Sequence, residues 1–473
     1  MAFVASSRLS IVSRAAVVGL ALILTTLAGQ RAAHAEALLL IEADTGKVLQ
    51  AENATYPWYP ASLTKLMTAY VTLKAVKDGR VSLNTLLTVS PTAAAQAPSK
   101  MGFRPGTQVT IDNALKMMMV KSANDMAVVL AEGVGGSIDG FSAEMNKAAQ
   151  RLGMTQTSYV NPNGLPADGQ ITSARDMGIL ARAIIRDLPE YEYFVHIPAI
   201  KFGRRITGNF NKLIGRYPGA DGMKTGFICA SGFNLVASAT RGNRRLIAVV
   251  LGAPSSSVRA AKAMQMLERG FSGGALSWLT PSLGTVDSLA PVSASPPNLR
   301  DDICGPKRKR PTIESDDDNA AISASNGTGD QAFSLFSTAS ASGALKPSEL
   351  LATAPAATEP VIVYTGPKRT GAALVAAVAA DEATQAAKVK GKGKKARIAK
   401  RGKPAAADRT RTAAAKPAAA KPAAAKPAET KPRPAATVAA RPKADAKTAA
   451  VKPASAKLAS KPASEKKNAP KSE

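Results

Sequence analysis

The chain has 473 residues and a formal net charge of +28, and it contains 2 His and 2 Cys. So few histidines disfavour both a Ser-His-Asp triad and a histidine-ligated zinc site. Two cysteines exclude a disulfide framework of the kind that small secreted domains use. A serine nucleophile in this chain would therefore need a base other than histidine.

The first 35 residues have the three-part pattern of a secretory signal peptide. Arg8 and Arg14 lie in a segment without acidic residues, residues 15–29 are apolar, and a small-residue cleavage site ends at Ala35. The apolar run is shorter than the ~20 residues that span a bilayer. We expect cleavage after Ala35 and an exported, periplasmic protein, with an uncleaved segment retained in the membrane as the alternative.

Residues 36–275 have the mixed apolar periodicity of one or two compact lobes. Residues 66–185 within them are largely helical in pattern. Apolar segments and turn signals predict a hairpin and three later strands that can share one sheet. These strand segments are residues 37–53 for the hairpin, followed by 223–230, 233–240 and 244–251.

The composition changes after residue 275. Residues 276–386 are polar, rich in Pro, Gly and Ser, and charged in blocks, which predicts a low-complexity linker. Within this linker, residues 359–366 are a possible strand and residues 371–388 a transient Ala-rich helix. Neither segment has an evident partner in the sequence.

Residues 387–473 form an Ala/Lys/Pro-rich tail that makes the protein basic. Residues 388–473 hold 25 Lys and Arg against 5 Asp and Glu, a net charge of +20 out of +28. With almost no large apolar residues, the tail is predicted to stay disordered. For an exported chain we expect electrostatic contact with anionic membrane or wall polymers and no nucleic acid, and the alternative is a solvated spacer.

One histidine and two cysteines remain after the signal peptide. His196 lies in a segment that reads as a strand or its edge, and we interpret it as structural. Cys229 lies in the folded region and Cys304 in the predicted linker. An oxidising compartment would permit a bridge between them. The sequence leaves open whether they pair, and we do not count on a bridge.

Two short motifs in the predicted helical region are candidates for chemistry, and each is weak alone. Ser62 and Lys65 lie one helical turn apart at the start of a helix, where the alternative is a helix cap and a solvent-facing lysine. Ser122 and Asn124, spaced Ser-x-Asn, interrupt two apolar helical patterns, as a cap and a turn would. Further elements are needed to make either motif specific.

A third motif makes the set specific. Lys224, Thr225 and Gly226 lie on the first of the three late strands, where the glycine lets a ligand approach closely. Ser-x-x-Lys, Ser-x-Asn and Lys-Thr-Gly in this order resemble the serine penicillin-recognising set. Several longer stretches are similar to the low-molecular-mass penicillin-binding proteins that act as D-alanyl-D-alanine carboxypeptidases. The resemblance covers residues 37–272, with the longer stretches at 99–111, 161–185, 222–239 and 255–271.

The resemblance implies an α/β (α+β) fold like that of the β-lactamases and DD-peptidases. This fold is an antiparallel sheet flanked by helices, with an inserted helical lobe and an active site between the lobes. The implied activity is removal of the terminal D-alanine from peptidoglycan pentapeptide, in cell wall biogenesis and cell shape. Penicillins and other β-lactams would acylate and inhibit the enzyme, and no metal or organic cofactor is required.

The catalytic roles follow from acyl transfer. Ser62 is the expected nucleophile, and Lys65 is its expected base. To accept a proton Lys65 must be neutral, which burial and the nearby cation of Lys224 would favour by lowering its pKa. The resemblance places Ser122 beside them, where its hydroxyl can relay a proton to the leaving amine.

The substrate-binding roles come from the same resemblance. Asn124 would hydrogen-bond the substrate backbone, Lys224 and Thr225 would hold the terminal carboxylate, and Arg259 would assist. The backbone N–H groups of Ser62 and Phe227 would form the oxyanion hole. The substrate-binding set is therefore Asn124, Lys224, Thr225, Gly226, Phe227 and Arg259.

Three alternatives stay open. A class A β-lactamase needs a glutamate that positions water, and the candidate Glu144 reads as a surface charge. A DD-endopeptidase would use the same residues on cross-linked peptides. A non-catalytic cationic envelope-binding protein would not need Ser62, Lys65, Ser122 and Lys224 together. Members of the family often carry a second β-rich domain and a terminal amphipathic helix, and neither is evident after Leu283.

Overall fold

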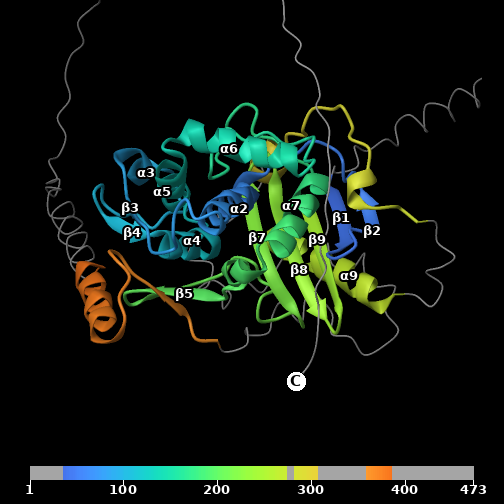
Figure 1. The fold of residues 1–473 in the computed structure, drawn as a ribbon. Helices are drawn as coiled ribbons and strands as arrows, with labels where there is room; N and C mark the ends of the chain where they lie inside the picture. Colours follow the sequence, from blue (N-terminus) through green and yellow to red (C-terminus); the bar gives the residue numbers. More distant parts are fainter. Residues whose placement is uncertain (1–35, 274–281, 307–357, 386–473) are drawn as a thin grey trace, which may run out of the picture. The chain divides into compact units, whose positions relative to one another are not determined.

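The computed structural model describes residues 36–273, 282–306 and 358–385 (Figure 1). The predicted signal peptide, residues 1–35, and the predicted tail, residues 387–473, lie outside the described residues. The predicted domain boundaries therefore remain predictions at both ends of the chain.

A five-stranded sheet forms the centre of the fold, in the order β2-β1-β9-β8-β7, with every neighbouring pair antiparallel. The hairpin and the three late strands predicted from the sequence are all in this sheet. Strand β7 lies at one edge, which leaves its outer side available to the helical lobe. The strands are β1 (Ala37–Glu42), β2 (Val48–Glu52), β7 (Ala220–Ile228), β8 (Gly232–Arg241) and β9 (Arg244–Ala253).

A mainly helical lobe is inserted between β2 and β7, so the predicted architecture is confirmed. Figure 1 shows this lobe beside the β7 edge of the sheet. The helices between β2 and β7 are α2 (Thr64–Lys77), α3 (Pro91–Ala95), α4 (Ile111–Val120), α5 (Asn124–Gly135), α6 (Ile138–Arg151), α7 (Ala174–Asp187) and α8 (Tyr193–His196). Of these, α7 packs on a face of the sheet and not beside its edge (Figure 1). The short strands β3 (Leu86–Thr88) and β4 (Gln108–Thr110) pair with each other, and β5 (Ala199–Phe202) pairs with β6 (Arg205–Gly208).

Helices cover both faces of the sheet, because successive side chains of a strand point to opposite faces. Leu39 and Ile41 of β1 meet Gly178 of α7, where an added Cβ would lie 2.8 Å from Leu39 Cδ2. Leu40 points to the other face and meets Gly270 of α9 (Ser256–Ser272), where an added Cβ would lie 2.9 Å from Leu40 Cδ2. The two glycines let both helices pack closely on an apolar strand.

Residues 282–306 pack on the domain, which corrects the interpretation of this stretch as linker. Cys229 and Cys304 form a disulfide, a pairing that the sequence analysis left open. Leu299 and Ile303 are 8% and 5% exposed and lie four residues apart, one at the start of the short helix α10 (Arg300–Cys304) and one within it. A few apolar residues at helical spacing are enough to dock a segment whose average composition is polar.

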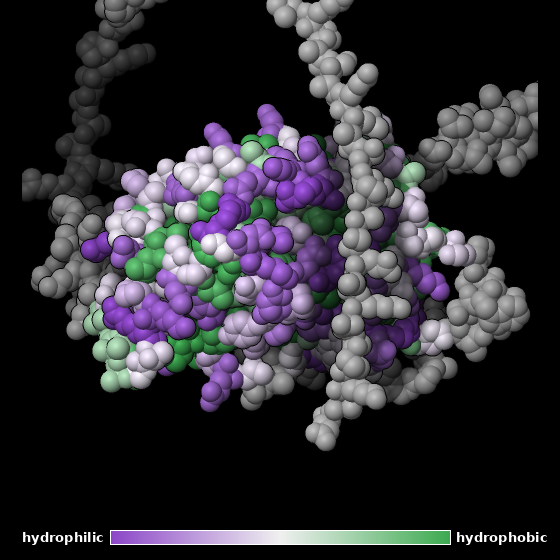
Figure 2. All heavy atoms as spheres, viewed as in Figure 1, coloured by the Kyte–Doolittle hydropathy of each residue, from purple (hydrophilic) through white to green (hydrophobic). Residues whose placement is uncertain are grey.

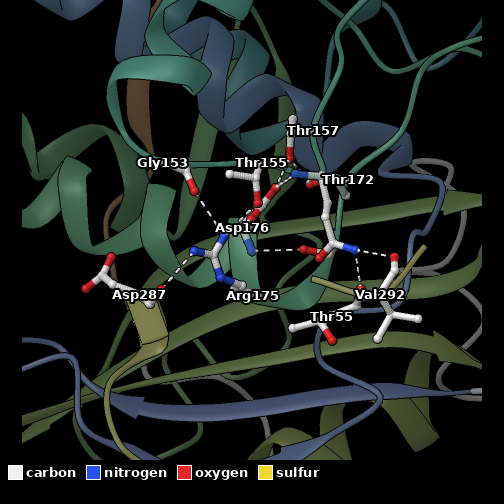
Figure 3. A network of polar contacts seen from close by, with 11 residues as sticks. Thr55, Gly153, Thr155, Thr157, Thr172, Arg175, Asp176, Asp287 and Val292 are labelled. Carbon is white, nitrogen blue, oxygen red and sulfur yellow. Dashed lines mark hydrogen bonds and ion pairs between the residues drawn. The ribbon is translucent and has the colours of Figure 1, made fainter. Parts of the chain in front are cut away.

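A buried polar network holds another part of the same segment (Figure 3). Arg175 donates to the carbonyl of Asp287 at 3.1 Å and to Asp176 Oδ1 at 2.7 Å. Gln156 donates to the carbonyl of Val292 at 2.9 Å and, through its backbone N–H, to Asp176 at 2.8 Å. The network joins the start of α7 to residues 287–292, far away in sequence.

Residues 358–385 also find a partner that the sequence did not reveal. Strand β10 (Val361–Val363) pairs in parallel with β5, and Val363 is 1% exposed. Residues 371–385 are helical, and Gln385 donates to the carbonyl of Phe202 at 2.9 Å. The predicted strand and helix both exist, but they belong to the folded unit instead of standing alone.

Two further findings complete the fold. His196 ends helix α8, so its interpretation as part of a strand was wrong; the strand β5 begins three residues later. Among the described residues, no helix is both long and apolar enough to cross a membrane. Figure 2 shows hydrophilic residues over much of one face, with apolar residues visible near its middle.

Candidate active site

Ser62 and Lys65 meet where the helical lobe begins. Ser62 lies in the 3-10 turn η1 (Ala61–Leu63), and Lys65 lies in the first turn of α2. Lys65 Nζ is 2.9 Å from Ser62 Oγ. Ala61 has a φ of +48°, a conformation that costs a residue with a Cβ some strain and that recurs at functional sites. The structure thus brings together the two residues expected to act as nucleophile and base.

The surroundings of Lys65 suit an uncharged amine. Its side chain is 0% exposed, and Nζ donates to Asn124 Oδ1 at 2.7 Å and to the carbonyl of Asn163 at 2.6 Å. Both of these oxygens can only accept. A neutral Lys65 has two N–H bonds for them and one lone pair left for the hydroxyl proton of Ser62.

Electrostatics favour the same state. Burial lowers the pKa of Lys65 well below its usual value, the positive charge of Lys224 lowers it further, and the negative charge of Asp125 acts in the opposite direction. Asp125 itself accepts from the backbone N–H groups of Met101 and Gly102 at 3.1 and 2.8 Å. Lys65 is therefore held in its neutral form, in which it can accept the hydroxyl proton of Ser62.

The Ser-x-Asn motif lies between α4 and α5. Ser122 is buried, has a φ of +57° and lines the same pocket as Ser62. The side-chain amide of Asn124 donates to the carbonyl of Ala97 at 2.9 Å while its oxygen accepts from Lys65. Asn124 therefore positions both the base and residues 97–99, in addition to facing the pocket where substrate contact was expected.

The Lys-Thr-Gly motif lies on the edge strand β7. Lys224 and Thr225 are each 1% exposed, and Lys224 Nζ donates to the carbonyl of Thr225 at 3.0 Å. An added Cβ on Gly226 would lie 3.0 Å from the backbone nitrogen of Ser62, so only a glycine lets β7 approach this closely. The approach brings Phe227 and Ser62, the two expected oxyanion donors, to one pocket.

Arg259 lies apart from the pocket lining. It is 1% exposed in α9, donates to the carbonyl of Asn234 at 3.2 Å, and lies 5.8 Å from the ring centroid of Phe233. Lys224 and Thr225 are also absent from the described residues that line the pocket around Ser62. The lining residues are Ser62, Pro98, Ser99, Ser122, Asn124, Asn163, Gly164, Leu165, Phe210, Phe227 and Ile228.

A loop to which the sequence pattern assigned no role, residues 161–165, also contributes to the pocket lining. Asn163 supplies the carbonyl that accepts from Lys65, and Gly164 has a φ of +80° directly against the carbonyl of Ala61. Asn161 Oδ1 accepts from the N–H of Gly164 at 2.8 Å, which fixes the turn. The signal was the sequence Asn-Pro-Asn-Gly, which is typical of a turn with one left-handed residue.

Glu144 is a surface charge, as the sequence indicated. It forms an ion pair with Arg80 at 2.8 Å, and both side chains are partly exposed. It does not line the pocket that holds Ser62. Glu144 is therefore not placed to position a hydrolytic water there.

Fold and site together define a class. A serine and a buried lysine at the start of a helix, faced by the edge strand of an antiparallel sheet, have the arrangement expected of a serine acyl-transfer site that uses lysine in place of histidine. A family model described as D-alanyl-D-alanine carboxypeptidase matches residues 25–255. DacB2 of Mycobacterium tuberculosis, also named a D-alanyl-D-alanine carboxypeptidase, is 32% identical over 46% of this chain and 74% of its own length. The chain belongs to the D-alanyl-D-alanine carboxypeptidase family.

Other relatives are more similar but longer. D-alanyl-D-alanine carboxypeptidase DacC of Escherichia coli is 40% identical over 50% of this chain and 61% of its own length. DacF of Bacillus subtilis is 38% identical over 50% of this chain and 62% of its own length. The matched region thus spans about three fifths of these relatives. The solved penicillin binding protein 5 of Haemophilus influenzae has 37% identity and a TM-score of 0.49, over 50% of this chain and 70% of its own.

Proposed function

We propose that this protein is a serine-type D-alanyl-D-alanine carboxypeptidase that removes the terminal D-alanine from peptidoglycan pentapeptide. The observation that carries the proposal is the contact of Lys65 Nζ with Ser62 Oγ at 2.9 Å, inside a buried site that lowers the pKa of the lysine. The names of the relatives support the substrate, because they are carboxypeptidases of this specificity.

Acylation begins when Ser62 Oγ attacks the carbonyl carbon between the two D-alanines while Lys65 takes the hydroxyl proton. The N–H groups of Ser62 and Phe227 stabilise the oxyanion. The C–N bond then breaks, and the amine of the leaving D-alanine receives a proton from Lys65 through Ser122. The buried cation of Lys224, with Thr225, attracts the free carboxylate of that D-alanine.

Deacylation reverses the proton path. Water attacks the ester carbonyl, gives one proton to Lys65, and the ester bond breaks to return the proton to Ser62 Oγ. The products are a tetrapeptide and D-alanine. A β-lactam would acylate Ser62 in the same way, because its cyclic amide presents a carbonyl and a nearby carboxylate to the same groups.

We place this activity outside the cytoplasm, in the periplasm, with a role in cell wall biogenesis and cell shape. The support is the signal-peptide pattern of residues 1–35 and the wall-specific substrate. The cationic tail would hold the enzyme near anionic membrane or wall by salt-sensitive attraction. This tether needs no hydrophobic anchor.

The test is release of free D-alanine from a soluble pentapeptide by the full-length protein and by Ser62→Ala. We expect release by the first and none by the second, together with loss of covalent labelling by a fluorescent penicillin. A Ser62→Ala protein that still labels and releases D-alanine would reject the proposal. Preferred cleavage of a cross-linked dimer would instead indicate an endopeptidase.

A further inference from the structure

A second cavity lies next to the catalytic pocket and encloses about 800 Å³. Three segments far apart in sequence form it: residues 100–121 of the helical lobe, the β5–β6 hairpin, and residues 365–385. Its volume is within the range of sites that bind small molecules and short peptides. The lining residues are Lys100, Met101, Phe103, Arg104, Thr107, Lys121, Ile200, Phe202, Arg204, Arg205, Thr207, Thr365, Asp381, Thr384 and Gln385.

The lining is strongly cationic, with five basic side chains against one acid. The acid, Asp381, is occupied, since its two oxygens accept from the backbone N–H and the hydroxyl of Thr365 at 3.1 and 2.9 Å. Among the described residues, no acidic side chain forms an ion pair with Arg104 or Arg204. We call this space the cationic cavity.

Residues 358–385 turn an open surface into this cavity. Beyond the β10–β5 pairing, the N–H of Gly366 donates to the carbonyl of Gln108 at 2.7 Å, and Gln385 donates to Phe202. The same residues bring the side chains of Thr384 and Gln385 to the lining. These hydroxyl and amide groups add hydrogen-bonding capacity beside the cations.

The cationic cavity and the catalytic pocket share a wall. Pro98 and Ser99 line the pocket, whereas the next two residues, Lys100 and Met101, line the cavity. Lys121 lines the cavity, and the residue after it, Ser122, lines the pocket; Ser99 Oγ donates to the carbonyl of Lys121 at 2.8 Å. The two spaces are therefore separated by one strip of chain, and a ligand that extends from Ser62 would have only this strip to cross to reach the cavity.

We propose that the cationic cavity binds the carboxylate groups of an acidic peptide, upstream of the D-alanyl-D-alanine that is cleaved at Ser62. The inference rests on the proposed function, because the ligand is the remote part of the same substrate. Guanidinium groups pair with carboxylates through two parallel hydrogen bonds, which makes arginine suited to this task. The shared wall favours a substrate extension over a separate phosphate-bearing ligand.

The experiment uses two peptides that end in D-alanyl-D-alanine and differ at two upstream acidic side chains, free in one and amidated in the other. For the full-length protein we expect a kcat/KM ratio of acidic to amidated peptide of about five or more, the effect of one or two charged contacts. Arg104→Glu and Arg204→Glu should each bring this ratio to about one or below.

Lys147→Glu is the matched control, because Lys147 is exposed on α6, lines neither space and undergoes the same charge change. It should keep the wild-type ratio, and the basic tail is identical in all variants. A wild-type ratio of one, an unchanged ratio in both arginine variants, or an equal loss in Lys147→Glu would overturn the inference while the function stands. Loss of the ratio in low millimolar phosphate but not in acetate would overturn it in favour of a phosphate site. No D-alanine from either peptide would overturn both.

Discussion

The catalytic pocket and the cationic cavity share residues 98–101 as a wall, but they hold their basic side chains differently. Lys65 and Lys224 are 0% and 1% exposed, and burial with mutual repulsion disfavours the charge on Lys65. Arg104 and Arg204 are exposed to solvent at the rim of the cavity. Burial prepares a lysine to exchange protons, whereas exposure leaves an arginine for recognition. If both proposals hold, the difference separates chemistry from binding along one strip of chain.

The largest expected effect comes from removing Lys65, the buried basic side chain of the catalytic pocket. Lys65→Ala should lower the rate of acylation by a fluorescent penicillin about 10³-fold, the typical contribution of a positioned general base. Lys100→Ala, across the shared wall, should leave that rate within about twofold, because this ligand carries no upstream carboxylates for the cavity. Equal losses in both variants would show that the two cation sets are not distinct.

Of the two regions, the catalytic pocket is the one whose residues could be predicted from the sequence. Ser62 and Lys65 are one helical turn apart, and such spacing puts two side chains on one face whatever the rest of the chain does. Strand β1 and the late strands β8 and β9 read as nearly continuous apolar runs because one sheet face meets α7 and the other meets α9. Local patterns therefore specified the sheet and the motifs that lie on its edge.

The cationic cavity could not be predicted from the sequence, because its walls depend on strand pairing between segments that are distant in sequence. Residues 361–363 join β5 across about 160 residues, and three apolar residues give no sign of which edge they will meet. Leu299 and Ile303 dock beside Cys229 for the same kind of reason. Composition averaged over a window hides such short anchors, since the charged residues around them dominate the average.

The disulfide tests whether residues 299–304 belong to the same cooperative unit as the pocket. Replacing both Cys229 and Cys304 by Ala should lower the free energy of unfolding by about 2–4 kcal/mol, as expected for a bridge that closes a long loop. The separation is 75 residues, and the bridge anchors the chain just after Ile228, which lines the pocket. Urea unfolding followed by fluorescence measures the loss. An unchanged midpoint would show that the bridge adds no stability.

Gly226 sharpens the comparison by disturbing only the pocket. An added methyl would lie 3.0 to 3.1 Å from the backbone of Pro60, Ser62 and Leu63, so β7 must move away from the nucleophile. Gly226→Ala should slow penicillin acylation by roughly 10- to 100-fold, because small displacements of reacting groups have large kinetic effects. Gly242→Ala is the control for a loss of stability alone: an added Cβ there meets nothing within 4 Å, the φ of +56° strains the backbone, and Gly242 does not line the pocket. An unaffected rate in Gly226→Ala would disprove the close-approach argument.

The smallest effect is a pair of opposite shifts in the pH dependence of acylation. The reactive form of Lys65 is the neutral amine, so the rate rises with pH through the lowered pKa of this group. Lys224→Ala removes a positive charge that lowers the pKa of Lys65, so the acid limb should move to higher pH. Asp125→Asn removes a negative charge that raises it, so the limb should move to lower pH. Second-order labelling rates across pH measure both limbs, and stability changes in either variant leave their positions unaffected. Shifts in the same direction, or none, would mean that Lys65 is not the titrating base and that burial alone distinguishes the pocket from the cavity.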